Sequence, residues 1–385
     1  MKLYIMLKLI PFVFCLSVNL IFSQSVTTLA SQISAQRIEG LSIDKYGNLY
    51  TPSGPGSVVY KITPNGEIST FASGLNFPQG GGTDSEGNLY ISNWNSGVIT
   101  KITPVGEKTT FLTGLSGPTG ITFSKTYNEL YVSNYSSNSI TKYVIASKTA
   151  TVFASGQGIN GPDGIVFDEE GNLYTANFND NKINKISASG TVTQFAVLPG
   201  NSSGYITYAK GYIYASGHRS HKIYKITLEG EVSVLAGTGS PGFKDGEAAQ
   251  AQFNLPNGIT ASLTGDSLFV SDADNRAIRI IDLLNSTTGI RDINHNTPIE
   301  FKLEQNFPNP FNPVTQIHYD LARDSFMSLT VFDLIGKEVA VLEKGFKPAG
   351  RYKIFFNGIS LASGIYFYSL SVDNRSQTKK LVLLK

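Results

Sequence analysis

The sequence predicts an all-β protein, and two features carry this prediction. The pattern Gly-Asn-Leu-Tyr recurs at intervals near forty residues, each time among short apolar stretches separated by Gly, Asn and Pro. Residues 302–385 lack this repeat but again alternate apolar and polar residues over short stretches. The composition agrees, because 38 of the 385 residues are glycine and only 16% are charged, whereas helical bundles are rich in Glu, Lys, Ala and Leu.

Residues 1–23 are expected to be a signal peptide that is removed after Ser23. Two lysines precede an apolar run, residues 9–22, which is too short to cross a bilayer but fits a signal-peptide core. An uncleaved membrane anchor is the alternative. The single cysteine lies in this run, so we expect the mature chain to have no disulfide and no thiolate metal site.

The charge balance argues against a nucleic-acid partner. Removal of residues 1–23 takes away two lysines and no acid, which leaves 29 basic and 29 acidic residues. Nonspecific nucleic-acid binding relies on clustered Lys and Arg, and the interior has no dense basic run. We expect no stable membrane span once the signal peptide is gone.

Residues 24–284 are predicted to form six copies of one β unit. The copies end at Tyr50, Tyr90, Tyr131, Tyr174, Tyr214 and Phe269, which are 40, 41, 43, 40 and 55 residues apart. The long last interval contains one insertion, near residues 237–252. Each copy reads as four short strands joined by Gly, Asn and Pro turns, and such a unit describes one blade of a β-propeller.

The N-terminal segment is predicted to complete the last blade. No fourth strand follows the sixth copy, whereas residues 25–31 resemble the fourth-strand segment at residues 67–73. A strand added there protects an otherwise exposed sheet edge. The sequence therefore predicts a six-bladed β-propeller with N-terminal strand closure.

The insertion and the segments after it resemble a known repeat family. Residues 237–246, 256–259 and 272–276 are similar to an NHL repeat. The other copies are looser, and they also resemble the streptogramin lyase-like and gluconolactonase-like propellers. The resemblance covers about residues 25–284, and it implies the six-bladed fold without naming an activity.

The C-terminal part is predicted to be a small immunoglobulin-like β-sandwich, residues 302–385, after a polar linker at residues 285–301. It is similar to the type A C-terminal sorting domain of the Bacteroidetes-type type IX secretion system. The matching segments are Asn-Pro-Phe-Asn-Pro at 309–313, residues 331–339, residues 361–368 and the ending at residues 379–385. The residues expected to carry the sorting signal are Gly336, Gly364, Lys379 and Lys380.

This resemblance implies how the chain travels. The partner would be the type IX secretion machinery, and the product would pass through the periplasm. We expect it to be secreted or held at the outer cell surface.

The starts of the inner strands should meet around a central channel of the propeller. The residues before the first-strand glycines are Glu39, Gln79, Thr119, Asp163, Ser203 and Asn257. Oxygen ligands suit Ca²⁺, and Glu39, Asp163 and Asn257 individually resemble metal-ligand positions of the gluconolactonase-like family, although their blade order departs from it. Alternatively, these side chains bond to water and turn backbone.

The loops after the second strands form a second set of candidate ligand-binding residues. These residues are Asn93, Trp94, Asn134, Tyr135, Asn177, Phe178, His218 and Asp272. Aromatic faces beside amides hold a sugar or another flat ligand with small ordering cost. The alternative is that the rings pack between blades while Asn and Asp cap their own turns.

His218 and His221 are the candidate catalytic residues, because streptogramin lyase-like enzymes use histidine and a carboxylate with Mg²⁺. Two histidines three apart in one loop otherwise form a solvated turn. The sequence favours a noncatalytic exported propeller that binds a glycan, a peptide or a small ligand, and Ca²⁺ is the one cofactor that it suggests. The alternatives are a Ca²⁺-dependent gluconolactonase-like hydrolase at Glu39 and Asp163, and a lyase at the two histidines.

Overall fold

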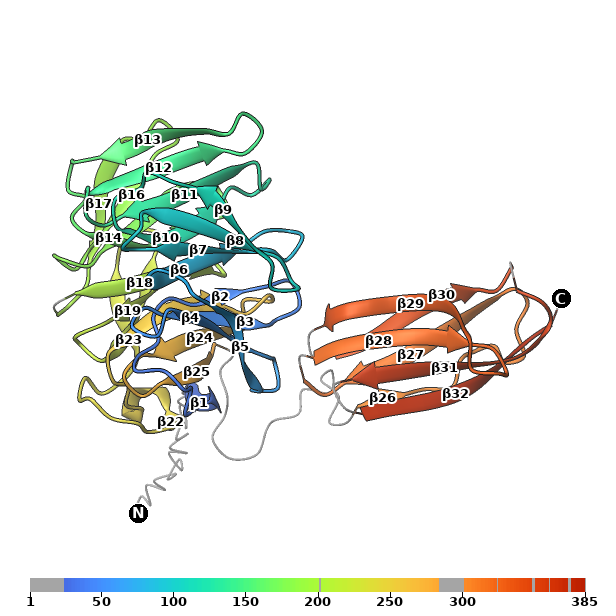
Figure 1. Ribbon diagram of the computed structural model, residues 1–385. Coiled ribbons are helices and arrows are strands. Elements are labelled where there is room, and N and C mark those ends of the chain that lie inside the picture. Colours follow the sequence, from blue (N-terminus) through green and yellow to red (C-terminus); the bar gives the residue numbers. More distant parts are fainter. Residues whose placement is uncertain are drawn as a thin grey trace, which may run out of the picture.

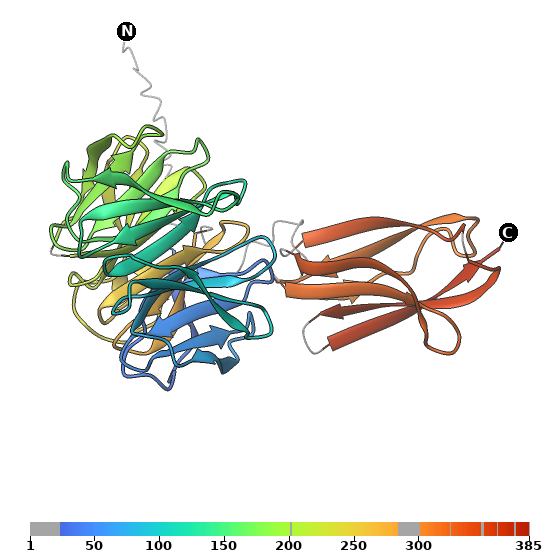
Figure 2. The same ribbon diagram turned by 45° about the horizontal axis from the view of Figure 1, so that its top comes forward.

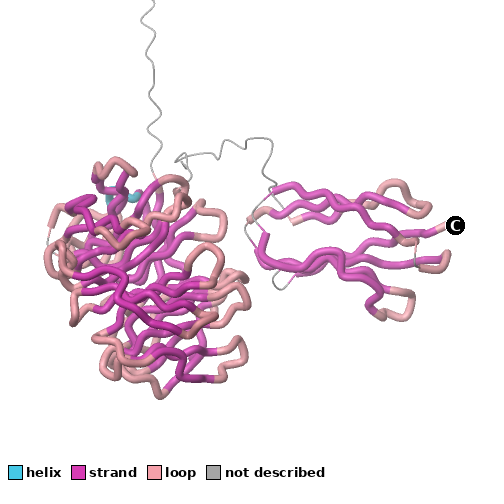
Figure 3. Tube along the Cα trace, turned by 90° about the horizontal axis from the view of Figure 1, so that it is seen from above, coloured by secondary structure: helices cyan, strands magenta, loops and turns pink. Residues whose placement is uncertain are grey.

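The computed structural model describes residues 24–200, 202–283, 301–323, 325–347, 350–359, 361–372 and 375–384. The expected signal peptide lies outside these residues, as does the expected linker apart from residue 301. Strands dominate the described chain (Figure 3), whose one helical element is a single 3-10 turn, Ala248–Gln250. The chain is therefore all-β, as the sequence predicted.

The sheets of the N-terminal part follow one another along the chain. Five of the sheets in the described residues 42–236 are antiparallel meanders of four consecutive strands. They are β2 (Ser42–Ile43), β3 (Leu49–Ser53), β4 (Val58–Ile62) and β5 (Ile68–Ser73); β6 (Pro78–Thr83), β7 (Leu89–Asn93), β8 (Val98–Ile102) and β9 (Lys108–Leu112); β10 (Pro118–Phe123), β11 (Glu129–Asn134), β12 (Ser139–Val144) and β13 (Thr149–Ser155); β14 (Pro162–Phe167), β15 (Leu173–Asn177), β16 (Lys182–Ile186) and β17 (Val192–Val197); β18 (Ser203–Ala209), β19 (Tyr212–Gly217), β20 (Lys222–Thr227) and β21 (Val232–Ala236).

A further sheet joins the two ends of this part. Its strands, in spatial order, are β22 (Gly246–Glu247), β1 (Ser25–Ala30), β25 (Ala277–Asp282), β24 (Ser267–Asp272) and β23 (Pro256–Ala261). β1 pairs antiparallel with β25, with Val26 opposite Ile281. This is the pairing that the sequence predicted for the N-terminal segment.

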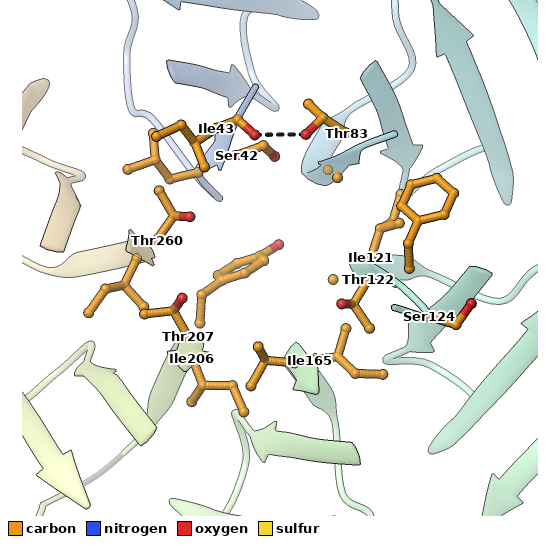
Figure 4. Close-up of a pocket in the computed structure, with 18 of the residues that line it drawn as sticks. Ser42, Ile43, Thr83, Ile121, Thr122, Ser124, Ile165, Ile206, Thr207 and Thr260 are labelled. Carbon is orange, nitrogen blue, oxygen red and sulfur yellow. Dashed lines mark hydrogen bonds between the residues drawn. The ribbon is translucent and has the colours of Figure 1, made fainter. Parts of the chain in front are cut away.

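The sheets are arranged around a common centre, and their first strands β2, β6, β10, β14, β18 and β23 lie innermost (Figures 2 and 4). Apolar side chains fill the spaces between neighbouring sheets. One such cluster joins Tyr174 and Ile183 of one sheet to Ile213 and Tyr224 of the next. This layout is propeller-like, and it gathers the starts of the inner strands at one end of a central channel.

The recurring Gly-Asn-Leu-Tyr turns are closed by an aspartate that precedes them. In one copy, Asp84 accepts hydrogen bonds from the backbone N–H of Asn88 (2.9 Å), from its side chain (2.8 Å) and from the hydroxyl of Tyr90 (3.1 Å). Asp44 and Asp168 do the same in their copies. The repeat is therefore a hydrogen-bonded turn, and the aspartate that closes it was not among the residues predicted from the sequence.

The C-terminal part is a two-sheet sandwich, separate from the propeller-like part (Figure 1). One sheet contains β26 (Lys302–Leu303), β27 (Val314–Leu321) and β30 (Gly350–Asn357), and the other β29 (Glu338–Lys347), β28 (Ser325–Phe332), β31 (Gly364–Val372) and β32 (Arg375–Leu383). Residues such as Ile317, Leu329 and Leu370 form its core.

The predicted sorting residues lie at the surface of this sandwich or begin its strands. Gly336, at φ 81°, ends the turn before β29, where its N–H donates to the carbonyl of Asp333. Gly364 begins β31, and Lys379 and Lys380 lie in the edge strand β32.

Candidate functional site

The loops after the second strands meet at one end of the channel. An inner strand starts where the neighbouring strand ends, as the pairing of Pro78 with Asn93 shows. The next residue of each loop is then held by one repeated backbone hydrogen bond. These bonds run from Trp94 to Phe77 (3.1 Å), from Tyr135 to Gly117 (3.0 Å), from Phe178 to Gly161 (2.8 Å) and from His218 to Ser202 (3.1 Å).

This shared geometry places Trp94, Tyr135, Phe178 and His218 side by side, and we call these four residues the aromatic arc. Successive ring centroids are 4.8, 6.2 and 5.5 Å apart. Trp94, Tyr135 and Phe178 are partly exposed, whereas His218 is buried. The Tyr135 hydroxyl donates to Asn179 (2.7 Å), which fixes that ring. The arc lines the channel mouth over consecutive sheets.

The polar residues predicted beside these rings lie inside the sheets instead. Asn93, Asn134, Asn177 and Asp272 are all buried. Asn93 and Asn134 donate to Thr100 (3.0 Å) and Thr141 (2.8 Å) of the adjacent strands. The structure therefore brings the predicted rings together but uses the amides and the aspartate to hold the strand ends.

The first and last sheets have no aromatic residue at the loop position equivalent to the arc residues, because Gly54 follows β3 and Ala273 follows β24. Arg37 lies at this part of the channel mouth. Its Nη2 lies 2.8 Å from His218 Nε2, and His218 Nδ1 lies 3.3 Å from the carbonyl of Pro256. Because a guanidinium can only donate, we assign the His218 proton to Nδ1.

This pairing decides what His218 can do. Burial, and then the charge of Arg37, lower the pKa of His218 to about 4. The ring is therefore neutral near pH 7, and its acceptor nitrogen is already engaged by Arg37. A general base needs a free lone pair within reach of the proton it removes, so this arrangement does not favour proton abstraction by His218.

His221 has a separate structural role. Its Nδ1 accepts the backbone N–H of Leu255 (3.1 Å) immediately before β23. Partial burial lowers its pKa. His218 and His221 therefore have different hydrogen-bond partners and do not form one paired site.

Two buried carboxylates lie in the channel below the arc. Glu39 accepts from the amide of Asn257 (2.9 Å) and lies 3.6 Å from Arg37. Burial raises the pKa of Glu39, while Arg37 and Asn257 oppose this effect. Burial and then the Glu39 charge raise the pKa of Asp163 to about 7. Near neutral pH, Asp163 therefore exists in both protonation states.

The expected place of Ser203 in this ring is wrong. Ser203 of β18 pairs with Gly217, just as Pro162 of β14 pairs with Asn177. Three residues later in both strands, Ile206 pairs with Ala215 and Ile165 pairs with Thr175. The register is therefore shifted by one residue. Gly204 takes the place equivalent to Asp163, and Tyr205 takes the place held by glycine in the neighbouring inner strands.

Tyr205 fills the channel because those neighbours are glycines. A Cβ added to Gly40 would lie 3.0 Å from Tyr205 Cζ, and one added to Gly80 would collide with its hydroxyl. The ring of Tyr205 thus reaches across the channel from β18 to the opposite inner strands. Its hydroxyl faces the Asp163 carboxyl and lowers that group's pKa, without meeting hydrogen-bond geometry. The sequence signal for this blocked channel is a tyrosine at the register position where the neighbouring inner strands have glycine.

Two of the predicted Ca²⁺ ligands, Glu39 and Asn257, already bond to protein groups, while the Asn257 Oδ1 has no partner in the described chain. Asn257 presents its amide nitrogen to Glu39, and Arg37 already balances the Glu39 charge. Across the described ranges, no three His, Cys, Asp or Glu side chains are grouped so as to hold a metal ion.

Two parts of the chain match protein-family models. Residues 108–212 match the SMP-30/Gluconolactonase/LRE-like region, and residues 305–384 match the Secretion system C-terminal sorting domain. Within the described residues, no helix is both long and apolar enough to span a membrane.

One curated protein is similar over a short stretch. It is the Arabidopsis thaliana "Protein SUPPRESSOR OF QUENCHING 1, chloroplastic", which is 41% identical over 88 residues. That stretch is 23% of this chain and spans only 8% of the curated protein.

Solved propellers share the fold of the N-terminal part. An auxiliary nutrient binding protein from Bacteroides thetaiotaomicron matches with a TM-score of 0.59 and 20% identity, covering 67% of this chain and 76% of its own. A streptogramin B lyase structure matches with a TM-score of 0.53 and 16% identity, covering 68% and 98%. The chain thus carries a gluconolactonase/NHL-like propeller region and a C-terminal sorting domain, which indicates export by type IX secretion to the cell surface or outside.

Proposed function

We propose that this protein is an exported propeller that binds a ligand at the aromatic arc and performs no catalysis. The observation that carries the proposal is the continuous row of rings from Trp94 to His218 at the channel mouth. Aromatic faces offer large contact area, and few polar groups then suffice to fix orientation.

The mouth also has a polar part, which lies beside the His218 end of the aromatic arc. Arg37 lies between the carboxylates of Glu39 (3.6 Å) and Asp274 (3.9 Å). A pyranose ring of a glycan has one apolar face and a polar edge, so it fits both parts of the mouth. The Bacteroides nutrient-binding neighbour, which shares the fold, supports a binding role.

The chain contains one tryptophan, Trp94, so its fluorescence reports directly on the proposed site. We expect a glycan from a screened panel to change this emission and to bind about tenfold more weakly to Tyr135→Ala, because a lost aromatic contact removes about 1 kcal/mol or more. The matched control is Tyr46→Ala, an exposed aromatic outside the arc, and it should bind normally. Binding that neither changes Trp94 emission nor depends on Tyr135 would contradict the proposal.

We further infer that the six sheets of residues 25–282 are six blades of one closed propeller, and that the sandwich is immunoglobulin-like. The first inference is supported by the pairing of β1, from the start of this part of the chain, with β25, from its end. Residues 1–23 would direct entry into the periplasm, and residues 302–385, beyond the linker 285–301, would direct passage across the outer membrane. A chain lacking residues 302–385 should remain in the periplasmic fraction. Its normal surface display would contradict this route.

The second candidate function is a Ca²⁺-dependent gluconolactonase-like hydrolase at Glu39 and Asp163. The match of residues 108–212 to the gluconolactonase-like region and the two buried channel carboxylates favour it. Metal analysis of the purified protein, Ca²⁺ titration and lactone hydrolysis test it, each with Glu39→Gln as the comparison. Stoichiometric Ca²⁺ and hydrolysis that both disappear in Glu39→Gln would replace the binding proposal.

A further inference from the structure

A cavity lies in the channel beyond Tyr205, away from the aromatic arc. It has a volume of about 380 Å³, and Tyr205 forms part of its wall. The inner strands surround it, with Ser42, Thr122, Thr207 and Thr260 arranged in a circle around the channel (Figure 4). Tyr205 crosses the channel between this cavity and the aromatic arc.

The lining combines hydroxyl groups with branched apolar side chains. Ser42, Thr122, Thr207 and Thr260 occupy equivalent register positions on four inner strands, where β6 has Gly82 instead. Ile121, Ile165, Ile206 and Ile259 precede this level in their strands and also line the cavity. The site therefore offers alternating polar and apolar contacts around a small volume.

The three threonine hydroxyls of this level remain available to a ligand in the cavity. Among the residues drawn in Figure 4, the marked hydrogen bond joins Thr83 to the carbonyl of Ile43 (2.7 Å) and leaves the four-hydroxyl level unbonded within the lining. The hydroxyls of Thr122, Thr207 and Thr260 line the cavity and have no hydrogen-bond partner within its lining. The Ser42 Oγ also has no partner in the described chain, but it is buried and sealed from the cavity. Hydroxyls that line a cavity without a protein partner are satisfied by water or by a ligand.

The charge of the lining limits the ligand further. Lys125 is the only charged residue among the lining residues, and it is exposed. An ionic ligand would therefore lose its hydration without finding an opposite charge inside the cavity. The volume corresponds to about a dozen water molecules at roughly 30 Å³ each, which leaves room for one monosaccharide together with several water molecules.

We propose that this lower channel is a second binding site, for a small uncharged polyol of monosaccharide size. Hydroxyl side chains both donate and accept hydrogen bonds, so they match polyol hydroxyls, while the isoleucines contact the C–H groups. This site is independent of ligand binding at the aromatic arc.

The test uses the full mature chain with D-glucose, myo-inositol and glycerol as probes, each at about 10 mM, followed by calorimetry and saturation-transfer NMR. We expect at least one probe to bind the wild type. The double variant Thr207→Val/Thr260→Val keeps the shape of the lining but removes two hydroxyls, and it should lose about tenfold in affinity. Thr110→Val, an exposed threonine on β9, is the matched control and should bind as the wild type does.

Two further variants make the outcome decisive. Val166→Phe places a larger side chain in the lining and should also block binding, so the result does not depend on one set of substitutions. Tyr135→Ala in the arc should leave polyol binding unchanged, which separates this site from the proposed function. The proposal is overturned if no probe binds, or if binding depends on Tyr135 and survives both channel variants.

Discussion

Replacing Arg279 with methionine should strongly destabilise the propeller. Arg279 is 0% exposed, and its guanidinium donates to the carboxylates of Asp272 (2.8 Å) and Asp245 (2.6 Å) and to the carbonyls of Gln252 (2.9 Å) and Lys244 (2.8 Å). These partners lie on β24 and in residues 244–252 of the insertion, so the Arg279 side chain links the two segments. Asp245 also accepts from Thr28 of β1 (3.0 Å), so the cluster reaches the N-terminal strand.

The expected magnitude follows from the charge left behind. Asp272 is fully buried, and after the substitution its carboxylate keeps only Asn275 (2.8 Å) and the N–H of Asn254 (2.6 Å) as partners. Removing one member of a buried ion pair costs about 3–5 kcal/mol. For a domain of this size, such a loss lowers Tm by roughly 6–20 °C.

Urea unfolding followed by Trp94 fluorescence measures this loss in the propeller, since the single tryptophan lies there. Burial already raises the pKa of Asp272, and loss of Arg279 should raise it further. The folded variant then binds more protons than the unfolded chain, so its deficit should grow as pH rises. Adding Asp272→Asn removes the unpaired charge and should restore part of the stability.

The matched control is Lys210→Met, which removes an ion pair to Asp266 whose lysine side chain is 49% exposed. We expect that change to cost less than about 1 kcal/mol. A loss of less than about 1 kcal/mol for Arg279→Met, or no recovery with Asp272→Asn, would refute the reasoning.

Three further changes test other parts of the propeller. Asp163→Asn should weaken the pH dependence of unfolding. The folded pKa of Asp163 is about 7, against an ordinary value of 3.8, so wild-type stability should fall as pH rises from about 4 to 7, by up to about 4 kcal/mol. Urea titrations at pH 5 and pH 8 measure this fall, and identical profiles for both proteins would contradict it. Asp84→Ala removes the hydrogen-bond acceptor of its turn and should lower the free energy of unfolding by about 1–3 kcal/mol. Calorimetry measures this loss with Ser85→Ala as the control, and equal Tm values for the two variants would count against it. Deletion of residues 25–30 removes β1 from its pairing with β25 and should lower Tm sharply in a thermal scan, because it exposes a sheet edge; an unchanged transition would contradict the closing role of β1.

Much of the organisation was predictable because it is local. The Gly-Asn-Leu-Tyr copies recur where Asp, Asn and Tyr close one turn within seven residues of chain, as Asp44 and Tyr50 do (3.0 Å). Such short-range hydrogen bonds leave a repeated pattern in the sequence. The all-β class, the sorting region and the added N-terminal strand followed from patterns of this kind.

The candidate site was predictable only in part. Trp94, Tyr135 and Phe178 each follow a strand of the same type, so their shared position was visible in the repeat. The Arg37–His218 pair spans 181 residues, and no local pattern marks it. A one-residue difference of register also moved Ser203 out of the ring, because alignment by the glycine alone misplaced the strand.

The sequence by itself determined the repeated strands, the turns that join them and the C-terminal sorting region, since these depend on neighbouring residues. Only the tertiary structure decided how the channel is divided. Tyr205 crosses it because Gly40 and Gly80 of distant strands leave room for its ring, and Arg37 reaches His218 because the first and fifth sheets are brought to the same channel mouth. Such contacts between distant segments arise from closure of the whole ring of sheets, which no single repeat contains.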